Sequence, residues 1–257
     1  MTKRVKKRRD AGQTKRNRGT IEFKAAADGA AEIYIYGDIG DDWYGGVTDV
    51  EFAKELAALG DVDKIDVRIN SAGGSVFQGF AIYSLLRAHK AEITVHVDGL
   101  AASIASVIAM AGDTVRLSDR AMMMIHNPWT ITVGGAEQLR KDADLLDKLA
   151  GQIAGAYLDR VTIDADAVTA AMDAETWYTA AEAVEIGLAD ETFAESKAAA
   201  AAWDLSRFVN VPQSLLEQDA GPTDDIAAIV AAKQADDAAA EAVAVRLRLV
   251  DVAEQSA

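Results

Sequence analysis

Short strand-like segments alternate with helical segments along most of this chain, and this alternation constrains the fold more than any other feature. The segments predicted as strands, because they alternate in polarity or are short and apolar, are 32–36, 64–70, 92–98, 114–117 and 122–126. Apolar spacing predicts helices at 49–59, 77–88, 135–161 and 179–188, and a buried helix in the run of small and apolar residues at 99–113. Strands and helices in this order predict an α/β domain of right-handed β-α-β units.

Composition divides the 257 residues into three parts. Residues 1–19 carry nine Lys and Arg against one Asp and hold little to bury, which predicts a disordered basic tail. Residues 20–194 contain the alternating pattern and are predicted to form the one folded domain. In 195–257, alanine runs and acidic residues predict a linker and an exposed helical tail, to which we assign no catalytic role.

Residue usage excludes several classes of site. The chain has no cysteine, so disulfides, thiolate metal sites and a cysteine nucleophile are excluded. Its three histidines (His89, His96 and His126) share no ligand spacing on a helix, so we predict neither a metal nor another cofactor. With no apolar run long enough for a membrane span and no signal peptide, we expect a soluble, cytoplasmic protein. The net charge of −15 argues against nucleic acid as a partner, apart from weak contact through the basic tail.

Three short segments carry candidate chemistry. The first, residues 70–75 (NSAGGS), follows a strand, and its paired glycines permit a ligand backbone to approach closely, although an ordinary turn has the same pattern. The second places Ser103 at the start of an apolar helix, either as a helix cap or as a nucleophile beside the Ile104 amide. Ser106, one turn later, is predicted to be buried and bonded back to the helix backbone. In the third, His126 ends an apolar strand, at the edge where active-site residues of α/β sheets collect.

Four segments together resemble the Clp protease proteolytic subunit (ClpP) family, in its order and spacing: 67–79 (VRINSAGGSVFQG), 99–106 (GLAASIAS), 123–128 (MMIHNP) and 179–190 (TAAEAVEIGLAD). The resemblance covers roughly residues 30–193 and implies the ClpP/crotonase-like fold of repeated β-α-β units with a long protruding handle helix. It also implies a Ser-His-Asp serine endopeptidase whose subunits form a homo-oligomeric ring. The matching positions make Ser103 the nucleophile and His126 the base. They make Gly73, Gly74 and Ile104 the groups that bind the oxyanion and the substrate backbone.

The acid of the triad is expected shortly before the helix at 179–188, where the chain offers Asp173 and Glu175. We assign Asp173, with Glu175 or no acid at all as the alternatives. The chain departs from the family pattern at Ala72, where proline usually precedes the paired glycines. The family's N-terminal pore segment is not recognisable either.

These departures resemble phage-type ClpP relatives, the head-maturation (prohead) proteases that cleave scaffold and capsid proteins during virion assembly. That interpretation implies capsid or scaffold partners and a location in the host cytoplasm or the prohead interior. The alternative within the enzyme class is a cellular subunit supplied by an ATP-dependent unfoldase, a Clp ATPase. A catalytically idle ClpP-fold scaffold is the alternative from another class, and the retained Ser103 and His126 argue against it. A crotonase-type acyl-CoA enzyme would leave segments 99–106 and 123–128 unexplained.

Overall fold

Within the residues that the computed structural model describes (20–25, 29–40, 46–194, 205–213 and 215), eight strands form one sheet. They are β1 (Thr20–Ala25), β2 (Ala30–Tyr36), β3 (Lys64–Ser71), β4 (Glu92–Ala102), β5 (Thr114–Ser118), β6 (Met122–Ile125), β7 (Thr176–Thr179) and β8 (Glu191–Phe193). The strands β2, β3, β4, β5 and β8 are parallel neighbours in that order, and β1 pairs antiparallel with β2. Strand β6 continues beside the end of β4, and β7 pairs antiparallel with β6. The predicted α/β arrangement is confirmed.

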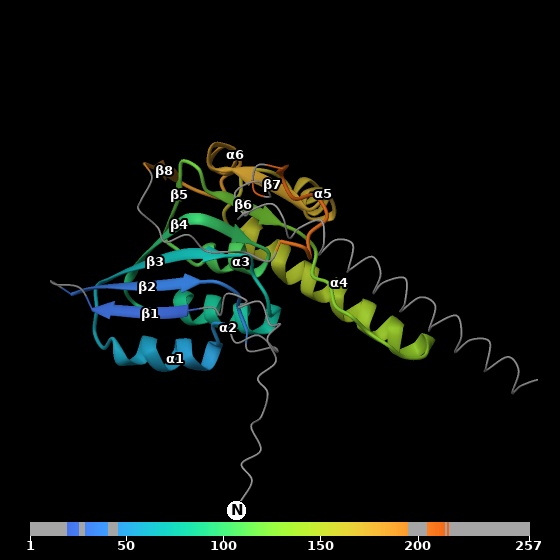
Figure 1. Cartoon of the computed structure of the whole chain (residues 1–257), viewed down its shortest axis with the longest axis horizontal. Coiled ribbons are helices and arrows are strands. Elements are labelled where there is room, and N and C mark those ends of the chain that lie inside the picture. The colour runs from blue at the N-terminus through green and yellow to red at the C-terminus, as the bar shows by residue number, and fades with distance from the viewer. Residues whose placement is uncertain (1–19, 26–28, 41–45, 195–204, 214, 216–257) are drawn as a thin grey trace, which may run out of the picture. The chain divides into compact units, whose positions relative to one another are not determined.

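Helices cover one face of this sheet and extend beyond it (Figure 1). They are α1 (Asp49–Ala58), α2 (Val76–Arg87), α3 (Ile104–Ala109), α4 (Ala136–Leu158), α5 (Ala165–Asp173) and α6 (Ala180–Glu185). The side chains of α4 are largely exposed over its N-terminal half, while Ile153, Ala156 and Tyr157 near its C-terminal end are buried. No helix in the described part of the chain is long and apolar enough to cross a membrane.

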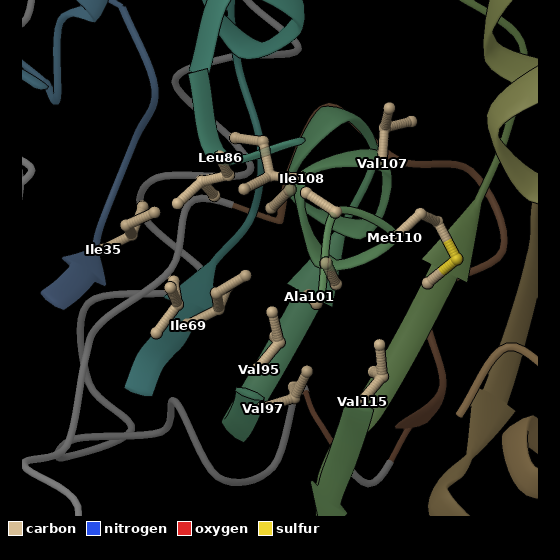
Figure 2. Packing of buried hydrophobic residues seen from close by; sticks show 14 of the residues in the cluster. Ile35, Ile69, Leu86, Val95, Val97, Ala101, Val107, Ile108, Met110 and Val115 are labelled. Carbon is tan, nitrogen blue, oxygen red and sulfur yellow. The ribbon is translucent and has the colours of Figure 1, made fainter. Parts of the chain in front are cut away.

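The core lies between the sheet and α1 to α3. Period-two alternation in the strands sends one set of side chains to this face, including Ile35 of β2, Ile69 of β3 and Val95 of β4, which are all fully buried. Figure 2 shows them facing Leu86 of α2 and Ile108 of α3. Each such side chain contributes about 1.5–3 kcal/mol by leaving water, so the register of the strands is strongly specified.

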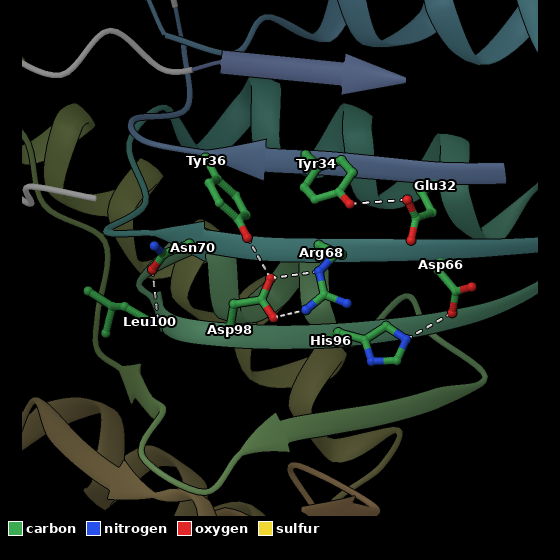
Figure 3. A network of polar contacts seen from close by, with 9 residues as sticks. All are labelled: Glu32, Tyr34, Tyr36, Asp66, Arg68, Asn70, His96, Asp98 and Leu100. Carbon is green, nitrogen blue, oxygen red and sulfur yellow. Dashed lines mark hydrogen bonds and ion pairs between the residues drawn. The ribbon is translucent and has the colours of Figure 1, made fainter. Parts of the chain in front are cut away.

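The opposite face of the sheet carries polar side chains that hydrogen-bond to one another. Asp98 of β4 accepts hydrogen bonds from Tyr36 Oη at 2.6 Å and from Arg68 Nε at 2.9 Å, as Figure 3 shows. Asn70 Oδ1 accepts from the Leu100 amide at 3.1 Å, close to where the pairing of β3 with β4 shifts register. Beyond the shift Ser71 pairs with Ala101, so the turn after β3 lies against Ser103 and the start of α3.

Several elements differ from the sequence predictions. Strand β4 continues to Ala102, so the helix predicted within 99–113 begins only at Ile104, because residues 100–102 pair with β6. The helix predicted at 179–188 is α6, which begins with a capping box formed by Thr179 and Glu182 and ends at Glu185. The elements that we did not predict are β1, α5, β7 and β8. The predicted basic tail at 1–19 lies outside the described residues, as does most of 195–257.

Candidate active site

Ser103 occupies a strained turn between β4 and α3. Its φ of 56° and ψ of −131° are unusual for a residue with a Cβ and cost about 1–3 kcal/mol. The residue stands at the N-cap of α3, but its side chain makes no capping hydrogen bond. The hydroxyl is directed toward His126 instead, so the helix-cap interpretation of Ser103 is wrong for this structure.

The backbone of Ser103 is held from two sides. Its amide donates to the Met124 carbonyl of β6 at 3.0 Å. Its carbonyl accepts from Ser106 Oγ at 2.6 Å, and Ser106 is fully buried, which confirms the predicted back-bonding serine. These bonds hold the strained turn in place.

His126 follows directly after β6 and meets Ser103 across the sheet edge. Because Ala102 pairs with Met124 in parallel register, the residues after both strands emerge at the same carboxyl edge. The distance from His126 Nε2 to Ser103 Oγ is 2.8 Å, suitable for the hydroxyl to donate to a neutral imidazole. Burial lowers the pKa of His126 below its ordinary value, the charge of Glu175 raises it, and the charge of Arg207 lowers it further.

The carboxylate that faces the other imidazole nitrogen belongs to Glu175. Its Oε2 lies 3.9 Å from His126 Nδ1, a charge contact longer than a hydrogen bond. Asp173, our sequence assignment for the acid, instead accepts a hydrogen bond from Asn127 Nδ2 at 2.6 Å. The physical reason is register: Ile125 pairs with Thr176, so the next residues outward, His126 and Glu175, come opposite each other. Asp173 lies two residues earlier, at the end of α5.

The paired glycines line the turn beside the nucleophile. A Cβ on Gly73 would lie 2.8 Å from Ser103 Cβ and 3.2 Å from the Ile104 amide nitrogen, and one on Gly74 would lie 2.0 Å from the Ile39 carbonyl oxygen. Only glycine fits at these two positions, where the backbones approach each other closely. The bonds from the Ile39 amide to the Gly73 carbonyl and from the Ser75 amide to the Ile39 carbonyl form a parallel bridge. In that geometry the Gly74 amide points away from Ile39.

A cavity of about 740 Å³ opens beside Ser103 and His126. Most of its wall is apolar and comes from α2, from residues 128–132 and from α4. The large apolar side chains in this wall are Phe77, Trp129, Ile131, Leu145, Leu146 and Leu149. Such a pocket suits an apolar side chain placed next to the reacting hydroxyl.

Residues 205–210, which we call the returning segment, also contact the site. The ring of Phe208 lies edge-on to that of His126, with centroids 5.5 Å apart, and Arg207 and Phe208 line the cavity. The sequence analysis placed these residues in a tail without a catalytic role, because they belong to no motif. The available signal was compositional: the stretch 203–212 (WDLSRFVNVP) interrupts alanine-rich sequence with large apolar residues.

A serine hydroxyl bonded to an imidazole at the carboxyl edge of a mostly parallel sheet, with a carboxylate on the far side of the ring, is the arrangement of a serine hydrolase. The profile of the Clp protease family matches residues 23–196. The chain therefore belongs to the Clp protease family, as its motifs predicted.

Similarity to individual proteins supports the same family assignment. The chain is 34% identical over 142 residues to an ATP-dependent Clp protease proteolytic subunit of Bacteroides thetaiotaomicron, a match that covers 53% of this chain and 64% of that protein. It is 30% identical over 165 residues to the protein of the same name from Pleurastrum terricola, covering 63% of this chain and 83% of that protein. The chain thus spans somewhat less than two thirds of the Bacteroides relative.

Proposed function

We propose that this chain is a serine endopeptidase that uses Ser103, His126 and Glu175 as its triad. The observation that carries the proposal is the 2.8 Å contact between His126 Nε2 and Ser103 Oγ, with Glu175 on the Nδ1 side of the same ring. Glu175 replaces Asp173 in the triad of the sequence analysis, because Asp173 bonds to Asn127. A positive charge that forms on the imidazole is then stabilised by the facing carboxylate.

In the proposed reaction Ser103 Oγ attacks the carbonyl carbon of the scissile peptide bond while His126 Nε2 takes its proton. The tetrahedral intermediate collapses as the carbon–nitrogen bond breaks, and His126 returns the proton to the leaving amine. Water then attacks the acyl-enzyme ester, with His126 again as base, and releases the carboxylic acid and the Ser103 hydroxyl.

The oxyanion of this reaction is assigned to backbone amides. The Gly74 amide points away from its bridge with Ile39, and the Ile104 amide stands at the first position of α3, next to Ser103. Gly73 brings these two groups together, since a side chain there would collide with Ser103. Each donor aimed at the oxyanion typically lowers the barrier by about 3–4 kcal/mol.

The apolar cavity supports a substrate class for this site. We assign it to peptides that place an apolar side chain against Trp129 and Leu146. A peptide series that varies only the residue before the cleaved bond tests this directly. Higher kcat/KM for leucine than for aspartate or lysine is the expected result.

Labelling by a fluorophosphonate or β-lactone probe tests the class of the protein. The full chain should be labelled at Ser103, and Ser103→Ala should abolish both labelling and peptide hydrolysis. Ser84→Ala removes an exposed serine of α2 that takes no part in the site, so it controls for the position of the label. Absence of labelling in the native chain would support the idle scaffold instead.

Two biological settings fit such an enzyme. The relatives carry the name of ATP-dependent proteolytic subunits, which supports a cytoplasmic, homo-oligomeric peptidase that works with a Clp ATPase. The head-maturation role rests on the sequence departures and on the stretches outside the family match, 1–22 and 197–257. Cleavage of a folded protein only when a Clp ATPase and ATP are added would favour the first setting. Cleavage of a phage scaffold protein without either would favour the second.

A further inference from the structure

The returning segment (residues 205–210) is anchored next to the paired glycines. Arg207 Nη2 donates to the Ala72 carbonyl at 2.9 Å and to Asp38 Oδ1 at 3.1 Å. Leu205 and Phe208 are 5% and 8% exposed, so the segment is packed into the domain at these two positions. It also lies outside residues 23–196, the region matched by the family profile. An element that the family profile does not cover therefore reaches the centre of the site.

Two backbone amides of the returning segment donate hydrogen bonds to the carboxylate that faces His126. Glu175 Oε1 accepts from the Val209 amide at 2.7 Å and from the Asn210 amide at 2.6 Å. Asn210 Nδ2 additionally donates to the Ala174 carbonyl at 2.7 Å. These bonds fix one oxygen of Glu175 and leave Oε2 directed at His126. Glu175 has a φ of 48°, which a side-chain-bearing residue keeps only when its surroundings hold it.

Phe208 of the same segment shields the imidazole. Its ring meets His126 at an interplanar angle of 73° and meets Trp177 of β7 at 83°, with centroids 5.5 Å and 5.6 Å apart. Among the described residues, the charged groups that face His126 are Glu175 from the loop before β7 and Arg207 from the returning segment. The segment thus shields the ring with Phe208 and places the charge of Arg207 beside it.

We propose that the returning segment is a positioning element of the active site, which holds Glu175 against His126 and keeps water from the imidazole. This inference rests on the proposed serine peptidase. It adds that the catalytic geometry is complete only with residues beyond the Clp protease region of the chain. The segment contacts the triad from outside and takes no part in bond making.

A proline substitution in the full chain tests whether the Val209 amide positions Glu175. Val209 has an 87% exposed side chain, so Val209→Pro removes an amide donor with little change in buried area, and Val209→Ala is the matched variant that keeps the amide. A hydrogen bond to a charged group predicts a kcat for Val209→Pro roughly 10-fold or more below that of Val209→Ala, with KM similar in both. Equal kcat values would overturn the proposal. A gain in activity would do so as well, because the segment would then be an obstruction.

The same pair in a Glu175→Gln background separates positioning from general stability. If the segment acts through the carboxylate, the kcat ratio between Val209→Ala and Val209→Pro falls toward one when Glu175 is already neutral. An unchanged ratio in that background means that proline damages the fold rather than the triad, and overturns the inference.

An NMR titration, which needs no catalytic turnover, tests whether Phe208 shields His126 from water. In the full chain labelled with ¹³C-histidine, His126 is assigned by the signal lost in His126→Gln. Phe208→Ala should raise the pKa of His126 toward its ordinary value, since water then reaches the ring. Phe193→Ala is the matched control, because Phe193 stacks edge-on against His96 at 5.7 Å and should leave the His126 titration unchanged. A Phe208→Ala titration equal to wild type would overturn the covering role, whether or not the chain hydrolyses peptides.

Discussion

The hydroxyl of Tyr157 lies 2.8 Å from that of Ser106, in the interior of the protein. Ser106 has one hydroxyl proton and directs it to the Ser103 carbonyl at 2.6 Å, so the Tyr157 hydroxyl is the donor of the pair. The chain of bonds therefore runs from α4 through Ser106 to the backbone of Ser103. Burial raises the pKa of Tyr157, which keeps the hydroxyl protonated as this role requires.

These hydrogen bonds predict that substitutions of Ser106 and of Tyr157 destabilise the protein by different amounts. Ser106→Ala should lower the free energy of unfolding by about 1–3 kcal/mol, because it leaves a buried Tyr157 hydroxyl without its acceptor. Tyr157→Phe should cost only about 0.5–1.5 kcal/mol, since Ser106 keeps its bond to Ser103. In the double variant the loss should be smaller than the sum of the two. Urea unfolding at one fixed protein concentration measures the stability of all three variants. Additive losses would contradict the linked hydrogen bonds.

The nucleophile and base predict non-additive losses of activity. Ser103→Ala and His126→Ala should each lower kcat on a peptide substrate by on the order of 10⁴-fold or more, and the double variant should be little worse than either. Both residues serve a single step, so removing the second takes away nothing further. Near wild-type hydrolysis by Ser103→Ala, measured on protein free of host peptidases, would contradict the assignment.

The two carboxylates give opposite predictions. Glu175→Gln should lower kcat strongly, because the charge facing His126 is lost, by up to roughly 10⁴-fold as in other triads. Asp173→Asn should have a small effect, since Asp173 bonds to Asn127 rather than to the imidazole. Paired measurements of kcat on the same peptide decide between them. A larger loss from Asp173→Asn would return the acid to the residue that the sequence analysis assigned.

The sequence was sufficient for the part of the site that local structure determines. Ser103 and His126 each stand at the end of a strand with a recognisable pattern, and parallel strands bring such ends to one edge. The paired glycines were equally visible, although only the structure shows that a Cβ on Gly73 would meet Ser103.

The remaining parts of the site depend on pairings between distant segments. Glu175 faces His126 because β7 pairs with β6 in one register, and β7 itself was not predicted from its four residues. A shift of that register by two residues would have brought Asp173 opposite His126. Contacts of the returning segment join residues more than 30 positions apart, as between Val209 and Glu175, which no periodicity along the chain reveals.

The lowered pKa of His126 predicts the pH dependence of hydrolysis. The imidazole must be neutral to accept the serine proton, and burial favours the neutral form. As pH falls, kcat/KM should therefore stay near its plateau through the ordinary value of 6.5 and decline only below it. Glu175→Gln removes a charge that raises this pKa, so the decline should move to still lower pH while the plateau itself drops. A decline centred above 6.5 in the wild-type profile would contradict the buried, neutral base.

The long helix α4 predicts self-association. Leu139 on its N-terminal half is 42% exposed, and Val133, just before the helix, is 93% exposed. Apolar side chains gathered in this way are typical of a surface that another subunit covers. Membership of the Clp protease family favours a second copy of this chain as that partner. Light scattering at micromolar concentration should therefore give the mass of an oligomer.

Charge placed in this surface should weaken the assembly. Val133→Glu with Leu139→Glu should shift the measured mass toward the monomer, because a carboxylate buried between subunits is costly without a partner. Val50→Glu is the matched control: Val50 is 73% exposed on α1, far along the chain from α4, and the same change there should leave the mass as it was. A monomeric wild-type chain with full activity would show that α4 needs no second subunit. An equal shift from Val50→Glu would show that added charge, rather than this surface, controls association.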